Sequence, residues 1–381
     1  MDARPLRICY FGTYRSQYIR NRLMMYRLRQ NGFEVVECHV TLWKGLEDRQ
    51  EVAGGGWMKP GFWSRAIYTY TKLIFKYFSI RDYDILMVGY PGQADIPLAR
   101  LLSGLRRKPL VWDVLMSLVL IAQERGLDSR SPVSVRLIRS IEKWALRLPD
   151  VLIVDTPEYA AWYHNTYGVP QDKIRLLPLG ADDRIFKPLA HIPDPQGIFH
   201  CLYYGTFIPN HGVQFIIEAA RLLADDKTIQ FELIGTGPCR AQIDEMVKDY
   251  ALSNVTLIDW MDVEGLTQKA AAADVILGTF GKTPQSLMTM QNKIHEGLAM
   301  GRPVINGDSP VMRSTLEHGV NVYLCERENA RSLADAIRFL KDQPLLREEI
   351  GRQGLEYYQK HLSLEQTGVE LSKYLQDLLK T

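Results

Sequence analysis

The sequence predicts an α/β protein with two doubly wound, Rossmann-like domains, and three observations lead to this fold class. Short apolar runs alternate with helical patterns along the first half of the chain. Such alternation is typical of a parallel sheet that is covered by helices on both faces. The pattern pauses at a proline-rich connection and starts again at Phe199. The length of 381 residues suits two domains of ordinary size.

The first series of apolar runs predicts five strands with helices between them. We expect the strands at 7–11, 34–36, 84–89, 110–112 and 151–154. The helical patterns cover 16–30, 62–78, 95–106, 114–124, 131–147 and 157–168. This series predicts a first domain over residues 1–185.

The second series predicts five more strands, after which the chain is almost wholly helical. We expect these strands at 199–204, 231–234, 255–258, 275–277 and 303–305. They predict a second domain over 186–360, followed by a last helix within 361–381 that packs back on the first domain. Ligands of doubly wound sheets bind outside the carboxyl ends of the strands. We therefore expect a ligand in a central cleft between the two domains.

Composition and charge indicate a cytoplasmic protein whose halves meet different partners. The first residues lack the apolar run of a signal peptide, and no stretch is apolar enough to span a bilayer. Five scattered cysteines without a C-x-x-C pair argue against zinc and against a disulfide framework. Residues 1–185 hold 27 Lys and Arg against 19 Asp and Glu, whereas the remainder holds 19 against 25. The basic half indicates a polyanionic partner surface.

The most informative segment, Gln291 to Ile305, predicts a short helix that has Asn292 as its N-cap and ends before Pro303. The start of a helix favours an anion, because backbone N–H groups point outward there. Lys293 adds a positive charge, and Glu296 follows three residues later, on a neighbouring position of the helix. A nucleotide sugar, with phosphates and hydroxylated rings, could contact both side chains. The alternative is an exposed surface ion pair.

Several motifs, in order along the chain, carry a resemblance to a known family. They are Pro178-Leu-Gly-Ala-Asp182 with Phe186-Lys-Pro188, Tyr204-Gly205 with Asn210-His-Gly212, Leu233-Ile-Gly-Thr-Gly-Pro238, Ala273-Asp274, and Glu296-Gly-Leu-Ala-Met-Gly-Arg-Pro-Val-Ile305. With these motifs the chain resembles the retaining glycosyltransferases of family 4, which have the GT-B fold. The resemblance covers about residues 170 to 340.

The resemblance implies a donor nucleotide sugar, of UDP or GDP type, that is bound mainly by the second domain. It implies an acceptor bound mainly by the first domain, no required cofactor, and no metal. Two departures alter the expected donor pocket. The first of the family's two glutamates, thought to contact sugar hydroxyls, is replaced by Met288, and the usual Arg and Lys that hold the diphosphate fall at Thr206 and His211. Lys293 and Lys282 are expected to supply the missing charge.

The remaining donor-site candidates lie around the predicted strand ends. Glu296 is expected to accept hydrogen bonds from the two ribose hydroxyls, because a carboxylate offers only acceptors. Trp260 is expected either to border the base or to pack in the core. The other predicted contacts are Gly205, His211, Gly235, Gly237, Gln291 and Asn292.

In the first domain, we expect Gly12 to let its loop approach the ligand's phosphates, with help from Arg15. Asp113 directly follows the expected strand 110–112, close to Ser117. The family often has a histidine or an acid near the transferred sugar, and we assign Asp113 to this catalytic role beside Lys293 and Glu296. The alternative for Asp113 is the N-cap of the helix 114–124.

Two basic segments predict contact with an anionic membrane surface. In 57–78, apolar residues at 63, 67, 70, 74 and 78 form one face, whereas Arg65, Lys72 and Lys76 share another. In 136–147, four basic residues form one solvated stripe. The alternative is a pair of ordinary amphipathic helices covering a sheet. Nucleic acid is not expected, because the aromatic residues line the apolar faces rather than exposed stacking positions.

Together these patterns predict a metal-independent glycosyltransferase of cell-envelope or polysaccharide biosynthesis, cytoplasmic and peripheral on the inner face of the membrane. Its acceptor is expected to be a saccharide or a lipid-linked saccharide. Two alternatives stay open: a nucleotide-sugar epimerase of the same fold, and a non-catalytic nucleotide-sugar-binding partner of another transferase.

Overall fold

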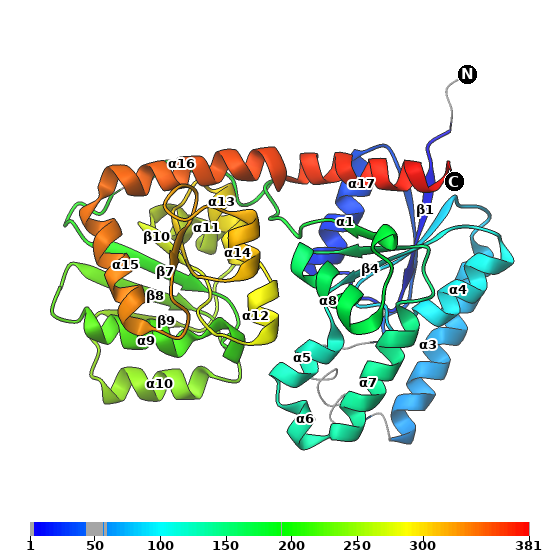
Figure 1. The fold of residues 1–381 in the computed structure, drawn as a ribbon, viewed down its shortest axis with the longest axis horizontal. Helices are drawn as coiled ribbons and strands as arrows, with labels where there is room; N and C mark the ends of the chain where they lie inside the picture. The colour runs from blue at the N-terminus through cyan, green and yellow to red at the C-terminus, as the bar shows by residue number, and fades with distance from the viewer. Residues whose placement is uncertain (1–3, 43–55, 57–58, 192, 381) are drawn as a thin grey trace. The chain divides into compact units, whose positions relative to one another are not determined.

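The computed structural model describes residues 4–42, 56, 59–191 and 193–380. The chain forms two compact units (Figure 1). Unit 1 comprises Met1–Leu179 with Thr367–Thr381, and unit 2 comprises Gly180–Gln366. The chain therefore changes unit at Leu179 and again at Gln366, instead of at 185 and 360.

Unit 1 is built on a six-stranded sheet whose paired strands are all parallel. Its order is β2-β1-β3-β4-β5-β6, and this doubly wound arrangement confirms the predicted fold class. The five predicted strands are present, and β6 is an additional short edge strand. The strands are β1 (Arg7–Gly12), β2 (Glu34–His39), β3 (Ile85–Val88), β4 (Leu110–Leu115), β5 (Val151–Val154) and β6 (Ile174–Leu176).

The helices of unit 1 cover both faces of this sheet. They are α1 (Ile19–Gln30), α3 (Pro60–Ser79), α4 (Ile96–Leu105), α5 (Leu118–Glu124), α6 (Leu127–Arg130), α7 (Pro132–Ala145), α8 (Pro157–Tyr167) and α17 (Leu364–Leu378), with a short 3₁₀ turn η2 (Gln171–Lys173). Leu371 and Leu375 of α17 share a buried cluster with Met24 and Leu28 of α1. The connection from β1 to β2 runs in one direction across the sheet, and those from β2 to β3, β3 to β4 and β4 to β5 run in the other. Because such crossovers are right-handed, α3, α4 and α7 lie together on the face opposite to α1.

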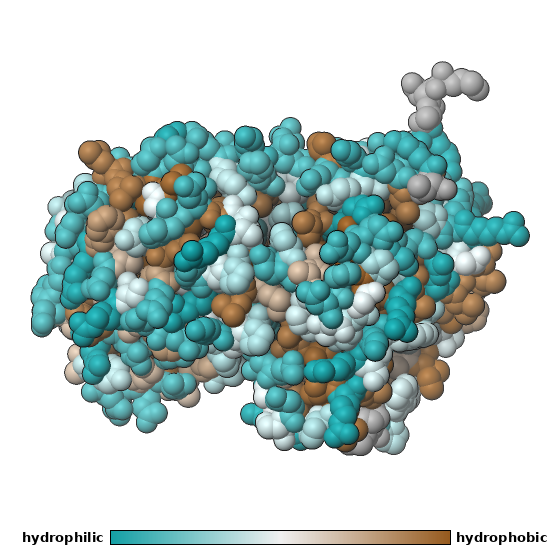
Figure 2. All heavy atoms as spheres, in the orientation of Figure 1, coloured by the Kyte–Doolittle hydropathy of each residue, from teal (hydrophilic) through white to brown (hydrophobic). Residues whose placement is uncertain are grey.

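The surface of unit 1 is unusually apolar over this second face. Figure 2 shows brown atoms over α3 and α4, where large apolar side chains remain exposed. No helix within the described residues is both long and apolar enough to cross a bilayer.

Unit 2 repeats the plan with a second parallel sheet of order β12-β11-β10-β7-β8-β9. Its strands are β7 (Phe199–Tyr204), β8 (Ile229–Ile234), β9 (Val255–Ile258), β10 (Val275–Leu277), β11 (Val304–Gly307) and β12 (Tyr323–Cys325). Its helical segments are η3 (Pro209–His211), α9 (Val213–Leu222), α10 (Arg240–Asp249), α11 (Val263–Ala272), α12 (Pro284–Met288), α13 (Asn292–Ala299), α14 (Pro310–Thr315), α15 (Ala330–Asp342) and α16 (Pro344–His361). The short edge strand β12 was not predicted.

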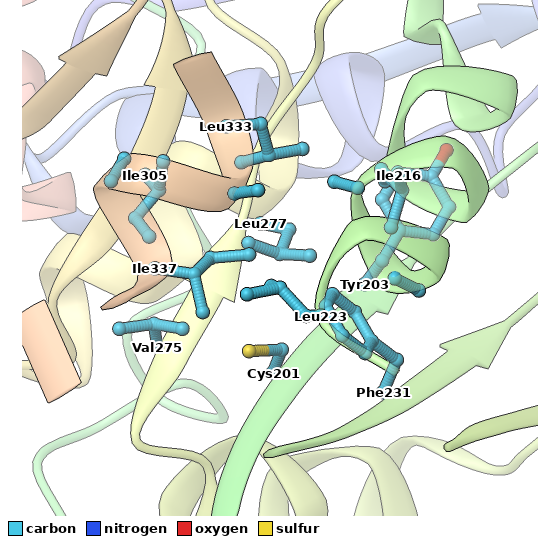
Figure 3. Close-up of a cluster of buried hydrophobic side chains, with 14 of the residues drawn as sticks. Cys201, Tyr203, Ile216, Leu223, Phe231, Val275, Leu277, Ile305, Leu333 and Ile337 are labelled. Atoms are coloured by element: carbon cyan, nitrogen blue, oxygen red, sulfur yellow. The ribbon is translucent and has the colours of Figure 1, made fainter. Parts of the chain in front are cut away.

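The core of unit 2 forms where α9 and α15 pack on one face of the sheet. Figure 3 shows Leu223, the C-cap of α9, and Ile337 of α15 beside the side chains of β7 and β10. All of these side chains are buried and apolar, so their removal from water stabilises the sheet. This rigid sheet fixes the strand ends from which the candidate site is built.

Candidate functional site

The candidate site lies at the edge of unit 2 where the parallel strands end. Tyr204 ends β7, and Ile234 ends β8 one strand away. The loop after β10 leads through α12 to α13, which places the start of α13 in contact with the end of β7. A ligand at this edge would meet loops instead of the sheet itself, as in other doubly wound folds.

Helix α13 begins one residue earlier than predicted. Its N-cap is Gln291 and not Asn292, which is the first residue of the helix. No side chain caps this start. An uncapped helix start is an anion site, because its outward N–H groups and the helix dipole both favour negative charge. The helix ends at Ala299, ahead of Pro303 as predicted.

Lys293 is buried, with 4% of its surface exposed, and its Nζ has no hydrogen-bond partner among the described residues. The Nζ atom lies 3.9 Å from the centre of the Tyr203 ring. Burial lowers the pKa of Lys293 to about 7, although the nearby Glu296 carboxylate acts in the opposite direction. The ammonium therefore has unused donors in a place where water is largely excluded.

Glu296 is buried beside Lys293, with 9% of its surface exposed. Burial raises the pKa of its carboxyl to about 7, whereas the Tyr204 hydroxyl and the Lys293 charge lower it. The Tyr204 hydroxyl is itself buried and makes no well-formed hydrogen bond within the described chain. The alternative of an exposed surface ion pair is therefore wrong, because both side chains lie inside the protein.

His211 belongs to the same cluster through Tyr203. Its Nδ1 lies 2.8 Å from the Tyr203 hydroxyl. Burial lowers the pKa of His211 well below its usual value, and the charge of Lys293 lowers it further. A neutral His211 leaves Lys293 as the cation of this cluster.

Three glycines at the strand ends allow this close packing. A Cβ on Gly205 would lie 3.2 Å from Lys293 Nζ, at a φ of +135° that disfavours any other residue. A Cβ on Gly235 would lie 2.0 Å from the Gly205 carbonyl oxygen, and one on Gly237 would lie 2.7 Å from that of Phe207. The close approach made by Gly235 and Gly237 is therefore to a neighbouring loop of the protein.

Gln291 presents one unused donor at the start of α13. Its Oε1 accepts a hydrogen bond of 2.9 Å from Thr279 Oγ1, whereas its buried Nε2 has no partner within the described chain. Asn292 is half-buried. The start of α13 thus combines two unsatisfied side-chain donors, on Gln291 and Lys293, with the backbone N–H groups.

The other predicted donor contacts are less enclosed. Trp260 is 77% exposed, so the alternative of core packing is wrong. The side chain of Lys282 is also exposed, and its backbone N–H donates to Glu328 Oε1 at 3.1 Å. Met288 ends α12 and is half-buried, and Thr206 is exposed.

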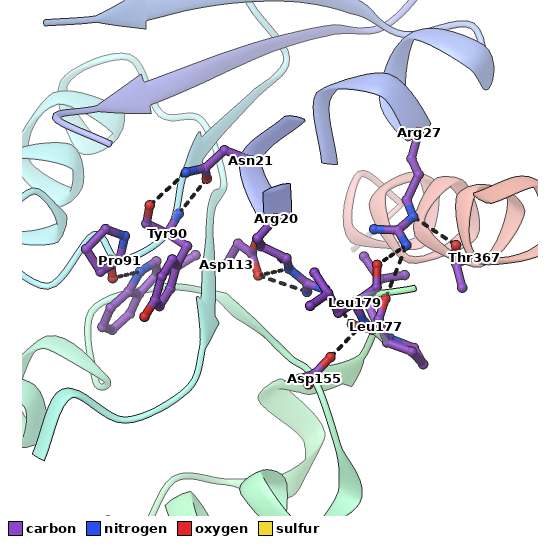
Figure 4. A network of polar contacts seen from close by, with 12 residues as sticks. Arg20, Asn21, Arg27, Tyr90, Pro91, Asp113, Asp155, Leu177, Leu179 and Thr367 are labelled. Carbon is purple, nitrogen blue, oxygen red and sulfur yellow. Dashed lines mark hydrogen bonds and ion pairs between the residues drawn. The ribbon is translucent and has the colours of Figure 1, made fainter. Parts of the chain in front are cut away.

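Asp113 has a different environment from the one expected. It lies within β4 and is completely buried, and both of its oxygens accept hydrogen bonds from Arg20, at 2.9 to 3.1 Å (Figure 4). Burial raises the pKa of its carboxyl, against the effect of Arg20. The predicted N-cap role is wrong, because Ser117 caps α5. A carboxylate enclosed in this way holds α1 against β4 and is not placed to touch a substrate.

Gly12 likewise serves a contact inside unit 1. A Cβ on Gly12 would lie 2.6 Å from Asp95 Oδ2, at a φ of +136°. Asp95 is buried and accepts hydrogen bonds from the Thr13 backbone and hydroxyl and from the Tyr70 hydroxyl. Gly12 therefore lets a buried carboxylate approach the end of β1. Arg15 is half-buried nearby in sequence.

No group of three or more His, Cys, Asp or Glu side chains in the described part of the chain is arranged to hold a metal ion.

Sequence reasoning missed Tyr203 and Tyr204. Both end β7, the strand directly before the Gly205 loop, and this position at a carboxyl strand end is the signal that could have found them. Tyr203 lies under the Lys293 ammonium, and Tyr204 lies beside the Glu296 carboxylate.

Each unit matches a family of known proteins. Residues 19–180 match the family described as Glycosyl transferase 4-like domain, and residues 199–343 match the family described as Glycosyl transferases group 1. With its two doubly wound sheets, the chain therefore belongs to the glycosyltransferases of GT-B fold.

Among characterised relatives, the chain is similar to the D-inositol 3-phosphate glycosyltransferase of Pseudarthrobacter chlorophenolicus, with 28% identity over 53% of this chain and 50% of that protein. The chain thus matches about half of that relative's length. It is also similar to the alpha-D-kanosaminyltransferase of Streptomyces kanamyceticus, with 24% identity over 71% of each chain.

Two solved structures share the fold along nearly their whole length. Sucrose-phosphate synthase from Thermosynechococcus elongatus superimposes with a TM-score of 0.73 at 18% identity, over 99% of this chain and 100% of that one. Anabaena HepE in complex with UDP superimposes with a TM-score of 0.70 at 14% identity, over 98% and 100%. HepE has also been solved with UDP-glucose, at a TM-score of 0.68, 14% identity and coverage of 98% and 99%.

Proposed function

We propose that this protein binds a nucleoside diphosphate sugar at the start of α13 and transfers its sugar to a saccharide or lipid-linked acceptor, with retention of configuration. The observation that carries the proposal is the buried Lys293 ammonium, whose Nζ has no hydrogen-bond partner among the described residues. An unsatisfied buried cation is costly unless an anion joins it. A diphosphate supplies that anion, and the uncapped helix start supplies further donors.

The proposed step breaks the bond between the sugar C1 and the diphosphate oxygen, and forms a bond from C1 to the acceptor oxygen. The acceptor hydroxyl loses its proton, and the departing diphosphate accepts it. Negative charge develops on the diphosphate as it leaves, so Lys293 and the start of α13 stabilise the transition state more than the ground state. We propose that no divalent metal is needed for this charge.

Glu296 is proposed to bind the ribose of the donor. It lies one helical turn after Lys293, and its carboxylate offers acceptors to two adjacent hydroxyls. The pKa near 7 means that binding must favour the ionised form, which hydrogen bonds from ribose would do. Gln291 Nε2 and the Tyr204 hydroxyl are proposed as further contacts, because both are buried and neither makes a well-formed hydrogen bond within the described chain.

A UDP-type donor is favoured by the solved structures of similar fold, because HepE was crystallised with UDP and UDP-glucose. The relatives' names concern transfer to an inositol phosphate and transfer of a kanosaminyl group. They support an acceptor that carries hydroxyl groups, which we propose is bound by unit 1. A GDP-type donor is the alternative to UDP. We place the reaction in cell-envelope or polysaccharide synthesis, on the inner face of a membrane that the protein joins peripherally.

A panel of labelled nucleotide sugars tests the proposal. Incubation with UDP-glucose, UDP-N-acetylglucosamine and GDP-mannose, with and without added saccharide and lipid-linked acceptors, is expected to release nucleotide only when an acceptor is present. Inversion of a sugar centre without transfer would instead identify an epimerase. Binding without any turnover would identify a non-catalytic partner.

A further inference from the structure

Helix α3 turns a row of large apolar side chains toward solvent. Its buried side consists of Ala66, Thr69, Leu73 and Tyr77, so the predicted apolar face at 63, 67, 70, 74 and 78 is not the face that packs on the sheet. The residues left outside are each more than half exposed, namely Trp63, Ile67, Tyr68, Phe75 and Phe78. A helix that only covers a sheet is expected to bury such residues, so their exposure favours an interaction surface over that alternative for α3. Residues 57 and 58 of the predicted segment lie outside the described part of the chain.

Helix α4 extends the apolar row beside α3. The Tyr77 hydroxyl of α3 donates to the Leu102 carbonyl of α4 at 2.8 Å, which fixes the two helices as neighbours. Leu101 and Leu105, spaced by four residues, are each more than half exposed. Their spacing places them on one outward side of α4.

Helix α7, on the same face of the sheet, has two outward stripes. One stripe is apolar, with spacings of four, four and three residues: Val133, Leu137, Ile141 and Trp144. The other is the predicted basic stripe, and all of its members are exposed: Arg136, Arg139 and Lys143 on α7, and Arg147 just after its end. Its buried side holds Val135 and Glu142. An apolar stripe that borders a basic stripe is the pattern of a helix at a lipid interface.

The charge on these three helices is of one sign. Neither α3 nor α4 contains an acidic residue, and the one acid of α7, Glu142, is buried. Glu142 accepts hydrogen bonds from Ser117, Leu118, Gln93 and Tyr167, so it faces the interior. Six exposed basic residues make no ion pair with any other described residue: Lys72, Lys76, Arg136, Arg139, Lys143 and Arg147. Arg100 of α4 is also exposed, but it pairs with Asp150 at 3.1 Å.

The concentration of apolar surface is specific to this face. Of the 21 large apolar side chains that are exposed in the described chain, 11 lie on α3, α4 and α7. Figure 2 shows part of this surface as brown atoms over α3 and α4. We call these 11 residues, together with the six basic residues, the α3/α4/α7 surface. Contiguous apolar patches of this kind mark interaction sites.

We infer that the α3/α4/α7 surface docks on a bilayer that contains anionic lipid. The apolar side chains enter the interface between headgroups and acyl chains, and the basic side chains meet the headgroups. The role of this docking rests on the proposed function, because a membrane would bring a lipid-linked acceptor to unit 1.

Two other occupants fit the surface less well. A second copy of the chain in a two-fold dimer would place the same basic residues against one another, since such an interface uses the same patch on both partners. Nucleic acid would use the exposed aromatic rings, which are more accessible than the sequence indicated, but the six exposed aliphatic side chains offer no ring for base stacking: Ile67, Leu101, Leu105, Val133, Leu137 and Ile141.

Vesicle flotation of the full chain tests the inference. Vesicles of phosphatidylcholine alone are compared with vesicles that also contain phosphatidylglycerol, each at low and high salt. We expect binding to the anionic vesicles, at least about tenfold weaker in high salt because the Debye length shortens. Absence of binding, or equal binding to neutral vesicles with no salt effect, overturns the inference.

Two variants assign the binding to the surface. Phe75→Ser with Trp144→Ser removes apolar contacts, and Arg136→Glu with Lys143→Glu reverses charge; all four side chains are exposed, so the fold is expected to remain. Each pair is expected to reduce the bound fraction at least about tenfold, because binding depends on buried apolar area and because each basic residue near an anionic surface contributes about 1 kcal/mol. Matched controls in unit 2, Leu345→Ser and Lys248→Glu, are expected to bind as the wild type does.

Additional readouts separate the rival explanations. A single-stranded oligonucleotide that binds through Arg136 and Lys143 while vesicles do not would assign the surface to nucleic acid. If light scattering shows dimers of the wild type, and Phe75→Ser with Trp144→Ser converts them to monomers, the α3/α4/α7 surface is a self-association site. UDP-glucose binding is measured on the same samples. Vesicle binding without UDP-glucose binding contradicts the proposed function but supports the docking surface. UDP-glucose binding without vesicle binding contradicts only the docking surface.

Discussion

The Lys293 ammonium lies 3.9 Å from the centre of the Tyr203 ring, and that ring is held by the 2.8 Å contact between its hydroxyl and His211 Nδ1. The electron-rich face of the ring offsets part of the cost of burying the charge. Lys293 Nζ donates no well-formed hydrogen bond to the Tyr203 ring or to any other described residue. The burial cost of the Lys293 charge is therefore only partly offset at the start of α13, which favours binding of an anionic ligand there.

Donor binding is expected to take up a proton above neutral pH. The pKa of Lys293 in the unliganded protein is about 7, so at about pH 8 most of the molecules hold a neutral amine. A bound diphosphate favours the ammonium and raises that pKa, so uptake approaches about one proton. Calorimetry with UDP-glucose in buffers of different ionisation enthalpy measures it. UDP-glucose is chosen because its diphosphate has no titrating proton in this range.

In this experiment, the affinity for UDP-glucose should fall as the pH rises above about 7, since the proton becomes harder to obtain. Lys293→Met should abolish both the proton uptake and this fall. Uptake that is unchanged in Lys293→Met would assign the proton to another group.

Glu296→Gln tests the ribose contact. Loss of a charged acceptor costs about 1.5–3 kcal/mol, so donor affinity should fall roughly 10- to 100-fold. The sharper comparison uses donors that lack the 2′ or 3′ hydroxyl. The wild type should discriminate against them, and Glu296→Gln should discriminate much less, because one partner of the bond is already gone. Equal discrimination by both proteins would mean that Glu296 does not touch the ribose.

Tyr203 separates the effect of the ring from that of the hydroxyl. Tyr203→Leu removes the ring face below Lys293, worth about 0.5–2 kcal/mol, and should weaken donor binding between a few-fold and roughly 30-fold. Tyr203→Phe keeps the ring and loses only the contact with His211, so its effect should be smaller. The test is the ratio of the two dissociation constants for UDP-glucose. A larger loss of affinity in Tyr203→Phe than in Tyr203→Leu would mean that the hydroxyl contact with His211 matters more for donor binding than the ring does.

The Arg20–Asp113 pair is expected to matter for stability. Both side chains are fully buried, so Asp113→Ala leaves an uncompensated guanidinium and should cost about 3–5 kcal/mol, or roughly 10 °C in Tm for the transition of unit 1. Scanning calorimetry measures it. The double variant Arg20→Met, Asp113→Leu removes both charges and should recover much of the loss. If it recovers stability and sugar transfer together, Asp113 has no chemical role; recovered stability without transfer would restore the catalytic assignment.

The sheets could be predicted because their central strands are continuous apolar runs. Leu110–Leu115 and Val151–Val154 are buried on both faces, and such runs are unmistakable in a sequence. The edge strands Ile174–Leu176 and Tyr323–Cys325 have three residues each and are partly exposed, so their pattern is too short to recognise. The N-cap of α13 was predicted one residue too late, because Asn292 is a common N-cap type and Gln291 is not.

The site was predictable in its charged residues but not in its environment. The spacing of Lys293 and Glu296 indicated neighbouring positions on a helix, yet it could not show that Tyr203, Tyr204 and Gly205 of a distant segment enclose them. Asp113 illustrates the opposite case. A carboxylate after an apolar run resembles a catalytic residue at a strand end, and only the packing of α1 brings Arg20 onto it.

The most direct test of the donor site is the affinity for UDP-glucose of Lys293→Met, compared with Lys282→Met as a matched exposed lysine of the same unit, by calorimetry near pH 7. We expect that Lys293→Met folds with at least the wild-type Tm, because a costly buried charge is gone, and binds the donor about 100-fold more weakly. Lys282→Met should bind within a few-fold of the wild type. Wild-type affinity in a folded Lys293→Met protein would mean that Lys293 does not hold the donor.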